Sequence, residues 1–133
     1  MIVAAAGNDA SNSVKEYPAA EGAYGLLAIA ASNASGKLAS FSNFGSWIDM
    51  AAPGEAITSA VPGGYGTWSG TSMAAPLAAG VAALVRSLDV GLAPGDVVKR
   101  IKRMSSTLCG SALRQVDAAA AVSNLAPPAT VCR

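Results

Sequence analysis

Short strand-like segments occupy the first half of the chain. The first two are apolar at consecutive positions rather than at alternate ones, which is typical of strands buried on both faces of a sheet. Gly, Pro and Asn residues bound these segments and predict the loops between them. The predicted strands are "IVAAA" (2–6), "GLLAIAAS" (25–32), a short strand near Ile48 within 40–54, and "AITSAV" (56–61), which stops at "PGGYG".

The second half of the chain carries the patterns of helices. Residues 72–88 are apolar on every side of a helical wheel, which predicts a buried helix. Proline is tolerated within the first turn of a helix, so Pro76 places the start of this helix close to Ser72. Residues 94–106 predict an amphipathic helix, and residues 114–125 predict a short terminal one.

The order of these elements predicts the fold class. Apolar strands followed by helices indicate an α/β layer with a mostly parallel sheet. The chain opens almost directly on a strand-like run, and its strands precede its helices. We therefore expect the last part of a larger α/β fold, whose N-terminal part lies elsewhere.

The composition narrows the function classes. Of the 133 residues, 52% are hydrophobic and 13% are charged, with a net charge of +1. This balance predicts a packed core and gives no reason to expect nucleic acid as a partner. The apolar runs are broken by Pro or Gly before they reach the roughly 20 residues of a membrane span, so we expect no membrane segment. The opening residues also lack the basic region of a signal peptide.

The chain has two cysteines, Cys109 and Cys132, whose spacing fits no metal motif. They could form a disulfide that pins the C-terminal tail, as in secreted proteins, or remain two unpaired thiols. The sequence leaves both alternatives open, because it does not fix the distance between the two Cα atoms.

Ser72 is the first candidate for chemistry. It lies in "GTSMA", where small residues precede the apolar helix. The free N–H groups and the dipole at a helix N-terminus favour negative charge. Such a position suits a serine nucleophile, because its reaction places a negative charge beside it. Spacing alone, however, favours the simpler interpretation that Ser72 only caps the helix.

Asn8 is the second candidate. It follows the first predicted strand in "AAAGN", where a side-chain amide could donate a hydrogen bond to an oxyanion. Alternatively, Gly7 and Asn8 form a turn that ends the strand.

The third candidate is the basic cluster "KRIKR" on the second predicted helix. An inner apolar stripe leaves the basic side chains on the opposite face, which is typical of a solvated surface. The stripe is Val97, Val98, Ile101 and Met104; the outer residues are Lys99, Arg100, Lys102 and Arg103. Nucleic-acid binding would need a wider basic surface and interleaved aromatic residues.

Four motifs together carry a resemblance. "VAAAGN", "YPA", "ASFSNFGSWIDMAAPG" and "SGTSMAAPLAAGVAAL" follow one another in the order and spacing of the subtilisin-like serine proteases, nearest to thermitase-like members. "SGTSMAAP" is a specific signature of that family's nucleophile loop. The resemblance covers residues 2–122 and corresponds to the C-terminal part of a three-layer catalytic domain. It implies a partial peptidase domain over residues 1–125 and a C-terminal tail over 126–133.

The resemblance also implies roles for individual residues. Ser72 resembles the acylating nucleophile, and Asn8 resembles the side-chain donor of the oxyanion hole. Ala5 and Gly7 resemble residues that wall the pocket for the substrate side chain before the cleaved bond. Pro18 resembles a position where the family often has a cis peptide bond.

The departures from the family pattern concern the proton-handling residues. The family's catalytic aspartate and histidine lie upstream of the "AAAGN" strand, and this chain contains no histidine. Leu77 stands where the family usually has a non-catalytic histidine. Without the preceding strands, "IVAAA" should be an open, apolar sheet edge, a hazard for self-association.

The resemblance therefore implies a secreted serine endopeptidase with protein or peptide substrates. Its active site would be completed by an N-terminal part carrying Asp and His. The alternative is an inactive subtilase remnant that serves as a scaffold or peptide-binding module. Family members often bind calcium, but no carboxylate cluster supports a site here, so we expect no cofactor or metal.

Overall fold

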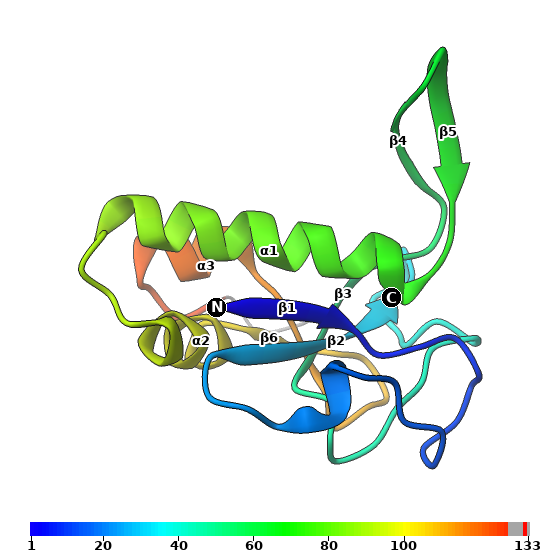
Figure 1. Cartoon of the computed structure of the whole chain (residues 1–133), viewed down its shortest axis with the longest axis horizontal. Helices are drawn as coiled ribbons and strands as arrows, with labels where there is room; N and C mark the ends of the chain where they lie inside the picture. The colour runs from blue at the N-terminus through cyan, green and yellow to red at the C-terminus, as the bar shows by residue number, and fades with distance from the viewer. Residues whose placement is uncertain (128–131, 133) are drawn as a thin grey trace.

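A five-stranded, mostly parallel sheet forms the centre of the computed structural model, which describes residues 1–127 and Cys132 (Figure 1). The strand order is β1-β2-β3-β7-β6. Strands β1, β2, β3 and β7 run parallel to one another, and β6 is antiparallel to β7. The bounds are β1 (Ile2–Ala5), β2 (Leu26–Ser32), β3 (Met50–Pro53), β6 (Ser106–Thr107) and β7 (Arg114–Gln115). The predicted α/β class with a mostly parallel sheet is confirmed.

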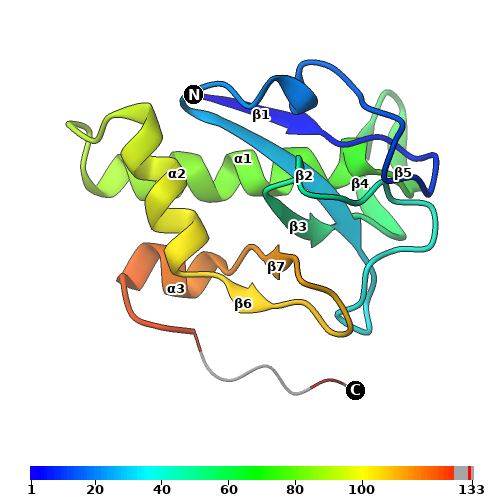
Figure 2. The ribbon, with the colours of Figure 1, turned by 90° about the horizontal axis from the view of Figure 1, so that it is seen from below.

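Helices cover one face of this sheet, and a short 3₁₀ helix with its flanking loops covers the other (Figures 1 and 2). The helices are α1 (Thr71–Leu88), α2 (Pro94–Arg103) and α3 (Ala118–Ser123), and the 3₁₀ helix is η1 (Ala19–Glu21). All seven residues of β2 are buried. This double cover explains why its sequence is apolar at consecutive positions.

The main core lies between the sheet and the helices. Leu27 and Ile29 of β2 and Met50 of β3 are fully buried against α1, α2 and α3. Val97 and Ile101 complete this core from α2, which confirms half of the predicted inner stripe; Val98 and Met104 are only partly buried at its margin.

Two predicted strands differ from the structure. The strand near Ile48 begins at Met50, because Ile48 is buried in a turn that its N–H closes onto the carbonyl of Gly45. The segment at 56–61 does form β4 (Ile57–Val61), but "PGGYG" is a hairpin turn rather than an end. The chain returns as β5 (Gly64–Trp68), antiparallel to β4, and this hairpin projects from the body (Figure 1). Gly63, with φ +84°, supplies the left-handed conformation that the turn requires.

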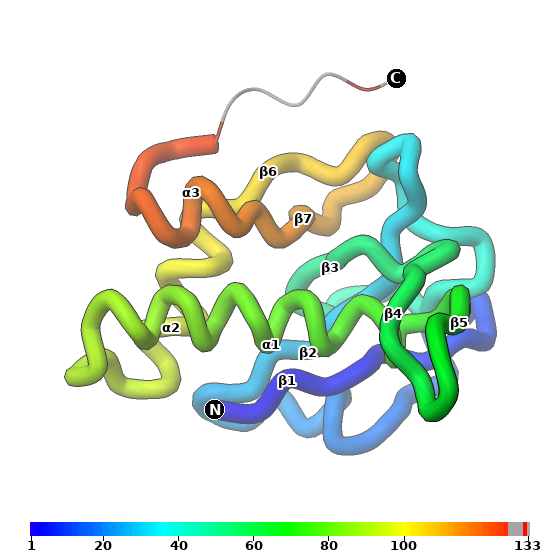
Figure 3. Tube along the Cα trace, turned by 90° about the horizontal axis from the view of Figure 1, so that it is seen from above, coloured from blue at the N-terminus to red at the C-terminus, as the bar shows by residue number. Residues whose placement is uncertain are grey.

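Helix α1 lies over the sheet, as Figure 3 shows, and only one of its faces is buried. The prediction of burial on every side is wrong for the described chain. Leu77, Leu84 and Leu88 have exposed fractions of 43%, 53% and 57%, because no described element covers the outer face of the helix. By length and hydropathy alone α1 could cross a membrane, but a core helix gives the same signal. We assign it to the core because its alanine-rich face packs on the sheet.

Pro76 lies in the second turn of α1 rather than in the first. The helix begins at Thr71, so Pro76 is its sixth residue. Proline has no N–H, so the carbonyl of Ser72 loses its partner four residues on. The predicted helix start near Ser72 is nevertheless confirmed.

Strand β1 is the edge of the sheet and pairs only with β2 among the described elements. Ile2 on this edge is 54% exposed. The expected open, apolar edge at "IVAAA" is therefore present in the described chain.

The two cysteines are bonded to each other, with their Cα atoms 5.5 Å apart. This resolves the alternative that the sequence left open. Cys109 lies after β6 and is buried, so the disulfide fastens the exposed Cys132 to the far end of the sheet. The rest of the predicted tail, apart from residues 126–127, lies outside the described residues.

Candidate active site

Ser72 is the second residue of α1 and is exposed to solvent. The N-cap is Gly70, and no side chain caps the helix, so the interpretation of Ser72 as a cap is wrong. The N–H groups of Met73 and Ala74 both bond to the carbonyl of Gly70. The N–H and the hydroxyl of Ser72 have no partner among the described residues, which leaves both available to a ligand.

Asn8 lies beside this helix start, and its side-chain orientation is fixed. Its Oδ1 accepts hydrogen bonds from the backbone N–H of Thr71 at 2.9 Å and from the Thr71 hydroxyl at 3.2 Å. Because a backbone N–H can only donate, the atom facing it must be the amide oxygen. The Nδ2 group has no partner among the described residues, so it remains an available donor beside Ser72.

Thr71 is a positioning residue that the sequence reading missed. Its side chain is fully buried, and its hydroxyl also accepts a hydrogen bond from the N–H of Gly7 at 3.0 Å. One hydroxyl thus joins the loop after β1 to the start of α1. The sequence signal is its position directly before Ser72, but its partners are more than 60 residues away.

Asn43 organises the loop that follows β1, and it was also missed. It is fully buried; its Oδ1 accepts from the N–H groups of Asp9 and Ser11, and its Nδ2 donates to the carbonyl of Ala6. These bonds hold the loop that carries Asn8. Gly7 has φ +99° within this loop, and a Cβ there would lie 2.4 Å from Asn43 Nδ2, so only glycine fits without rearrangement.

The nucleophile loop is fastened to β3 through two glycines. The N–H of Gly70 donates to the carbonyl of Gly54 at 2.7 Å. A Cβ on Gly54 would lie 2.6 Å from Ala31 Cβ and 2.8 Å from the carbonyl oxygen of Gly70. The "APG" turn therefore needs glycine to let the start of α1 approach the sheet.

An open pocket of about 540 Å³ brings the predicted site residues together. Ser72 and Asn8 line it, and so do Ala5 and Gly7, which places all four sequence-predicted residues on one surface. The remaining lining residues are Val3, Ala4, Asp9, Glu16, Tyr17, Pro18 and Thr71. The peptide bond between Tyr17 and Pro18 is cis, as the resemblance implied.

The imidazole base expected for Ser72 is absent from this chain, because the sequence contains no histidine. Asp49 is engaged elsewhere. Its carboxylate accepts a hydrogen bond from the N–H of Ala28 and pairs with Lys102 at 2.7 Å. Among the described residues there is also no group of three metal-binding side chains. The site therefore presents, within the described chain, an exposed serine hydroxyl and unpaired N–H donors, while the chain supplies no imidazole for proton transfer.

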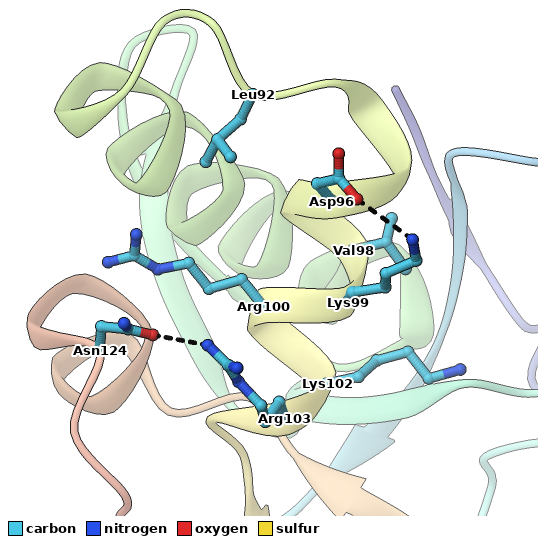
Figure 4. A pocket seen from close by; sticks show the side chains of 8 residues that line it. All are labelled: Leu92, Asp96, Val98, Lys99, Arg100, Lys102, Arg103 and Asn124. Carbon is cyan, nitrogen blue, oxygen red and sulfur yellow. Dashed lines mark hydrogen bonds and ion pairs between the residues drawn. The ribbon is translucent and has the colours of Figure 1, made fainter.

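The basic cluster on α2 lines a separate hollow of about 730 Å³ (Figure 4). Its side chains are engaged within the chain. Lys99 pairs with Asp96 and Lys102 with Asp49. Arg103 donates to Asn124 Oδ1, and Arg100, which was expected to face outward, is half-buried and donates to the last carbonyls of α3. These contacts support a structural role for the cluster.

A model of the subtilase family matches residues 1–125. Among the relatives, the subtilisin-like serine protease Pen c 1 of Penicillium citrinum is 47% identical over 108 residues, which are 80% of this chain and 26% of the relative. The extracellular protease of Xanthomonas campestris is 40% identical over 134 aligned positions, which cover 89% of this chain and 23% of the relative.

Solved structures of subtilisin-like proteases also superpose on this chain. A protease from Pseudoalteromonas arctica superposes with a TM-score of 0.78 at 36% identity, covering 93% of this chain and 42% of that one. A cold-adapted subtilisin-like serine proteinase gives a TM-score of 0.75 at 36% identity, covering 84% and 42%. The chain thus spans about a quarter of the length of these curated relatives and less than half of these solved chains.

Proposed function

Because this chain belongs to the subtilase family, we propose that it forms the serine-bearing part of a serine endopeptidase active site. The observation that carries the proposal is the arrangement around Ser72. An exposed hydroxyl lies at a helix start, beside two unengaged donors, its own N–H and the Nδ2 of Asn8.

In this proposal the hydroxyl of Ser72 attacks the carbonyl carbon of a peptide bond. The negative charge that develops on the carbonyl oxygen is stabilised by the N–H of Ser72 and by Asn8 Nδ2. A histidine from outside the chain takes the serine proton and then gives it to the leaving amine, held in place by an aspartate. Water then releases the acyl group from Ser72.

We propose that the missing acid and base belong to a polypeptide segment that pairs with the open edge of β1. That edge ends beside Ala5 and Asn8, so a strand added there would run toward the active-site pocket. The exposed leucines on the outer face of α1 would be covered by the same partner. Residues 1–125 would then be part of a larger peptidase domain.

We also propose an extracellular setting. The disulfide between Cys109 and Cys132 fits an oxidising compartment, and a relative is named an extracellular protease. The substrates would be proteins or peptides.

An inactive, peptide-binding subtilase remnant is the second candidate, and the absence of histidine favours it. The two candidates differ in peptide cleavage. We expect no practical cleavage by the 133 residues alone, because the oxyanion donors without the acid and base leave only weak catalysis. Cleavage should appear when the upstream catalytic region of a relative, such as the Xanthomonas protease, precedes residue 1, and it should be lost in Ser72→Ala. A well-folded chimera with no cleavage would favour the remnant.

A further inference from the structure

The pocket beside Ser72 carries two carboxylates that lack a cationic partner. Asp9 and Glu16 both line it, and no lysine or arginine is among its described lining residues. The ion pairs of the described residues join Lys99 to Asp96 and Lys102 to Asp49, both outside the pocket. The negative charge of the pocket is therefore not neutralised within the described chain.

The position of Glu16 is tied to a residue of the substrate wall. A Cβ built on Gly7 would lie 2.6 Å from Glu16 Cγ, so the side chain of Glu16 lies directly over Gly7. Asp9 immediately follows Asn8, and its Oδ2 accepts a hydrogen bond from Asn43 Nδ2 at 3.2 Å. The buried Asn43 thus helps to hold Asp9 at the pocket.

Tyr17 is a third residue of the pocket that can attract a cation. The residue belongs to the pocket lining and is 66% exposed, so it remains accessible to a ligand. The face of an aromatic ring attracts cations. Two carboxylates and an exposed ring around one apolar wall favour a long side chain that ends in a positive charge.

We propose that this pocket selects substrates with arginine or lysine before the cleaved bond. The inference rests on the proposed function and on the family resemblance, which implies that Ala5 and Gly7 wall the pocket for the substrate side chain at that position. Ala5 and Gly7 would contact the aliphatic stem, and the charged head would lie between Asp9 and Glu16. These two carboxylates are then specificity-determining residues, and they take no part in the chemical step.

The test compares arginine with citrulline, which has a similar shape but no charge. Two otherwise identical peptide substrates carry one or the other before the cleaved bond, and both are offered to the chimera that supplies the acid and base. We expect kcat/KM to be about tenfold or more higher for arginine, since two carboxylates contribute to a partly solvated site. The preference should weaken at high salt.

Matched variants assign the effect to the pocket. In the double variant Asp9→Asn with Glu16→Gln, the arginine-to-citrulline ratio should fall toward one, through a lower kcat/KM for the arginine peptide. Glu55→Gln removes an exposed carboxylate outside the pocket and should keep the ratio. A ratio near one in the unmodified protein, or a ratio that survives the double variant, would overturn the proposal.

A binding measurement separates this proposal from the proposed function. In the Ser72→Ala chimera, which cannot cleave, the same two peptides are titrated and their dissociation constants compared. Tighter binding of the arginine peptide supports the charged pocket even where no cleavage is found, and only the endopeptidase proposal would then fail. Equal binding of the two peptides overturns the specificity proposal, whatever the cleavage result.

Discussion

The amide oxygen of Asn8 accepts two hydrogen bonds from Thr71, one from the backbone N–H at 2.9 Å and one from the hydroxyl at 3.2 Å. This pair fixes which end of the Asn8 amide faces the helix start and leaves Nδ2 without a partner among the described residues. The residue before the candidate nucleophile thereby orients the candidate oxyanion donor. The donor is set before any substrate arrives, which is the condition for strong electrostatic stabilisation.

Replacing Thr71 by valine should destabilise the protein and loosen Asn8. The change keeps the shape of the side chain but leaves the N–H of Gly7 without its acceptor, at an expected cost of about 1–3 kcal/mol in the free energy of unfolding. Urea denaturation measures this cost. Thr71→Ser keeps the hydroxyl and should recover most of the loss; equal losses in the two variants would show that the hydroxyl bonds are unimportant.

The loop after β1 should not accept a side chain at Gly7. Gly7→Ala combines a φ of +99° with a close approach to Asn43, so we expect a loss of about 2–5 kcal/mol in stability. Gly22→Ala is the matched control, because its φ is +62° but no atom lies within 4 Å of the new Cβ. Only the backbone cost of about 1–2 kcal/mol should remain there. Thermal melts of both variants would refute this account if the two losses were the same.

The isolated 133-residue chain should fold marginally or self-associate. The open edge of β1 and the exposed leucines of α1 provide the contact surface. Leu84→Lys should reduce association in sedimentation velocity runs at several concentrations, with little change in stability. Ala82→Lys on the buried side of the same helix should instead unfold the chain. A monodisperse monomer with a cooperative melt for the unmodified chain would contradict the prediction.

The disulfide should contribute substantially to stability. Cys109 and Cys132 close a loop with a sequence separation of 23, for which the chain-entropy model gives about 3 kcal/mol. Cys132→Ser, or reduction of the native chain, should lower the urea midpoint accordingly. A midpoint that does not change on reduction would mean that the cross-link does not constrain the unfolded chain.

Much of the fold could be predicted from local pattern. The continuous apolar run of β2 indicated a strand buried on both faces. Pro76 located the helix start near Ser72, although the proline itself lies in the second turn. The exposure of Leu77 and Leu84 could not be predicted, because an apolar pattern shows what a helix can bury and not what covers it. Strand β5 was missed because glycines that normally end a strand here turn the chain back into a hairpin.

In the candidate site, too, some residues could be predicted from the sequence and others could not. Ser72 and Asn8 were found from motif order, and Ala5 and Gly7 followed from the resemblance. Thr71 and Asn43 were missed, since their role lies in hydrogen bonds to residues more than 30 positions away along the chain. Such partners come into contact only in the folded chain, so a local sequence pattern does not reveal them. The unpaired charges of the pocket likewise depend on which side chains the fold brings together.

Covalent labelling by a serine-directed phosphonate tests the central claim most directly. In the chimera that supplies Asp and His, the account predicts a single adduct, located at Ser72 by peptide mass spectrometry and absent in Ser72→Ala. Asn8→Ala should slow the reaction roughly 100- to 1000-fold, a magnitude taken from subtilisin itself. A folded chimera that shows no adduct, or an adduct at another serine, would contradict the assignment of Ser72 as the nucleophile.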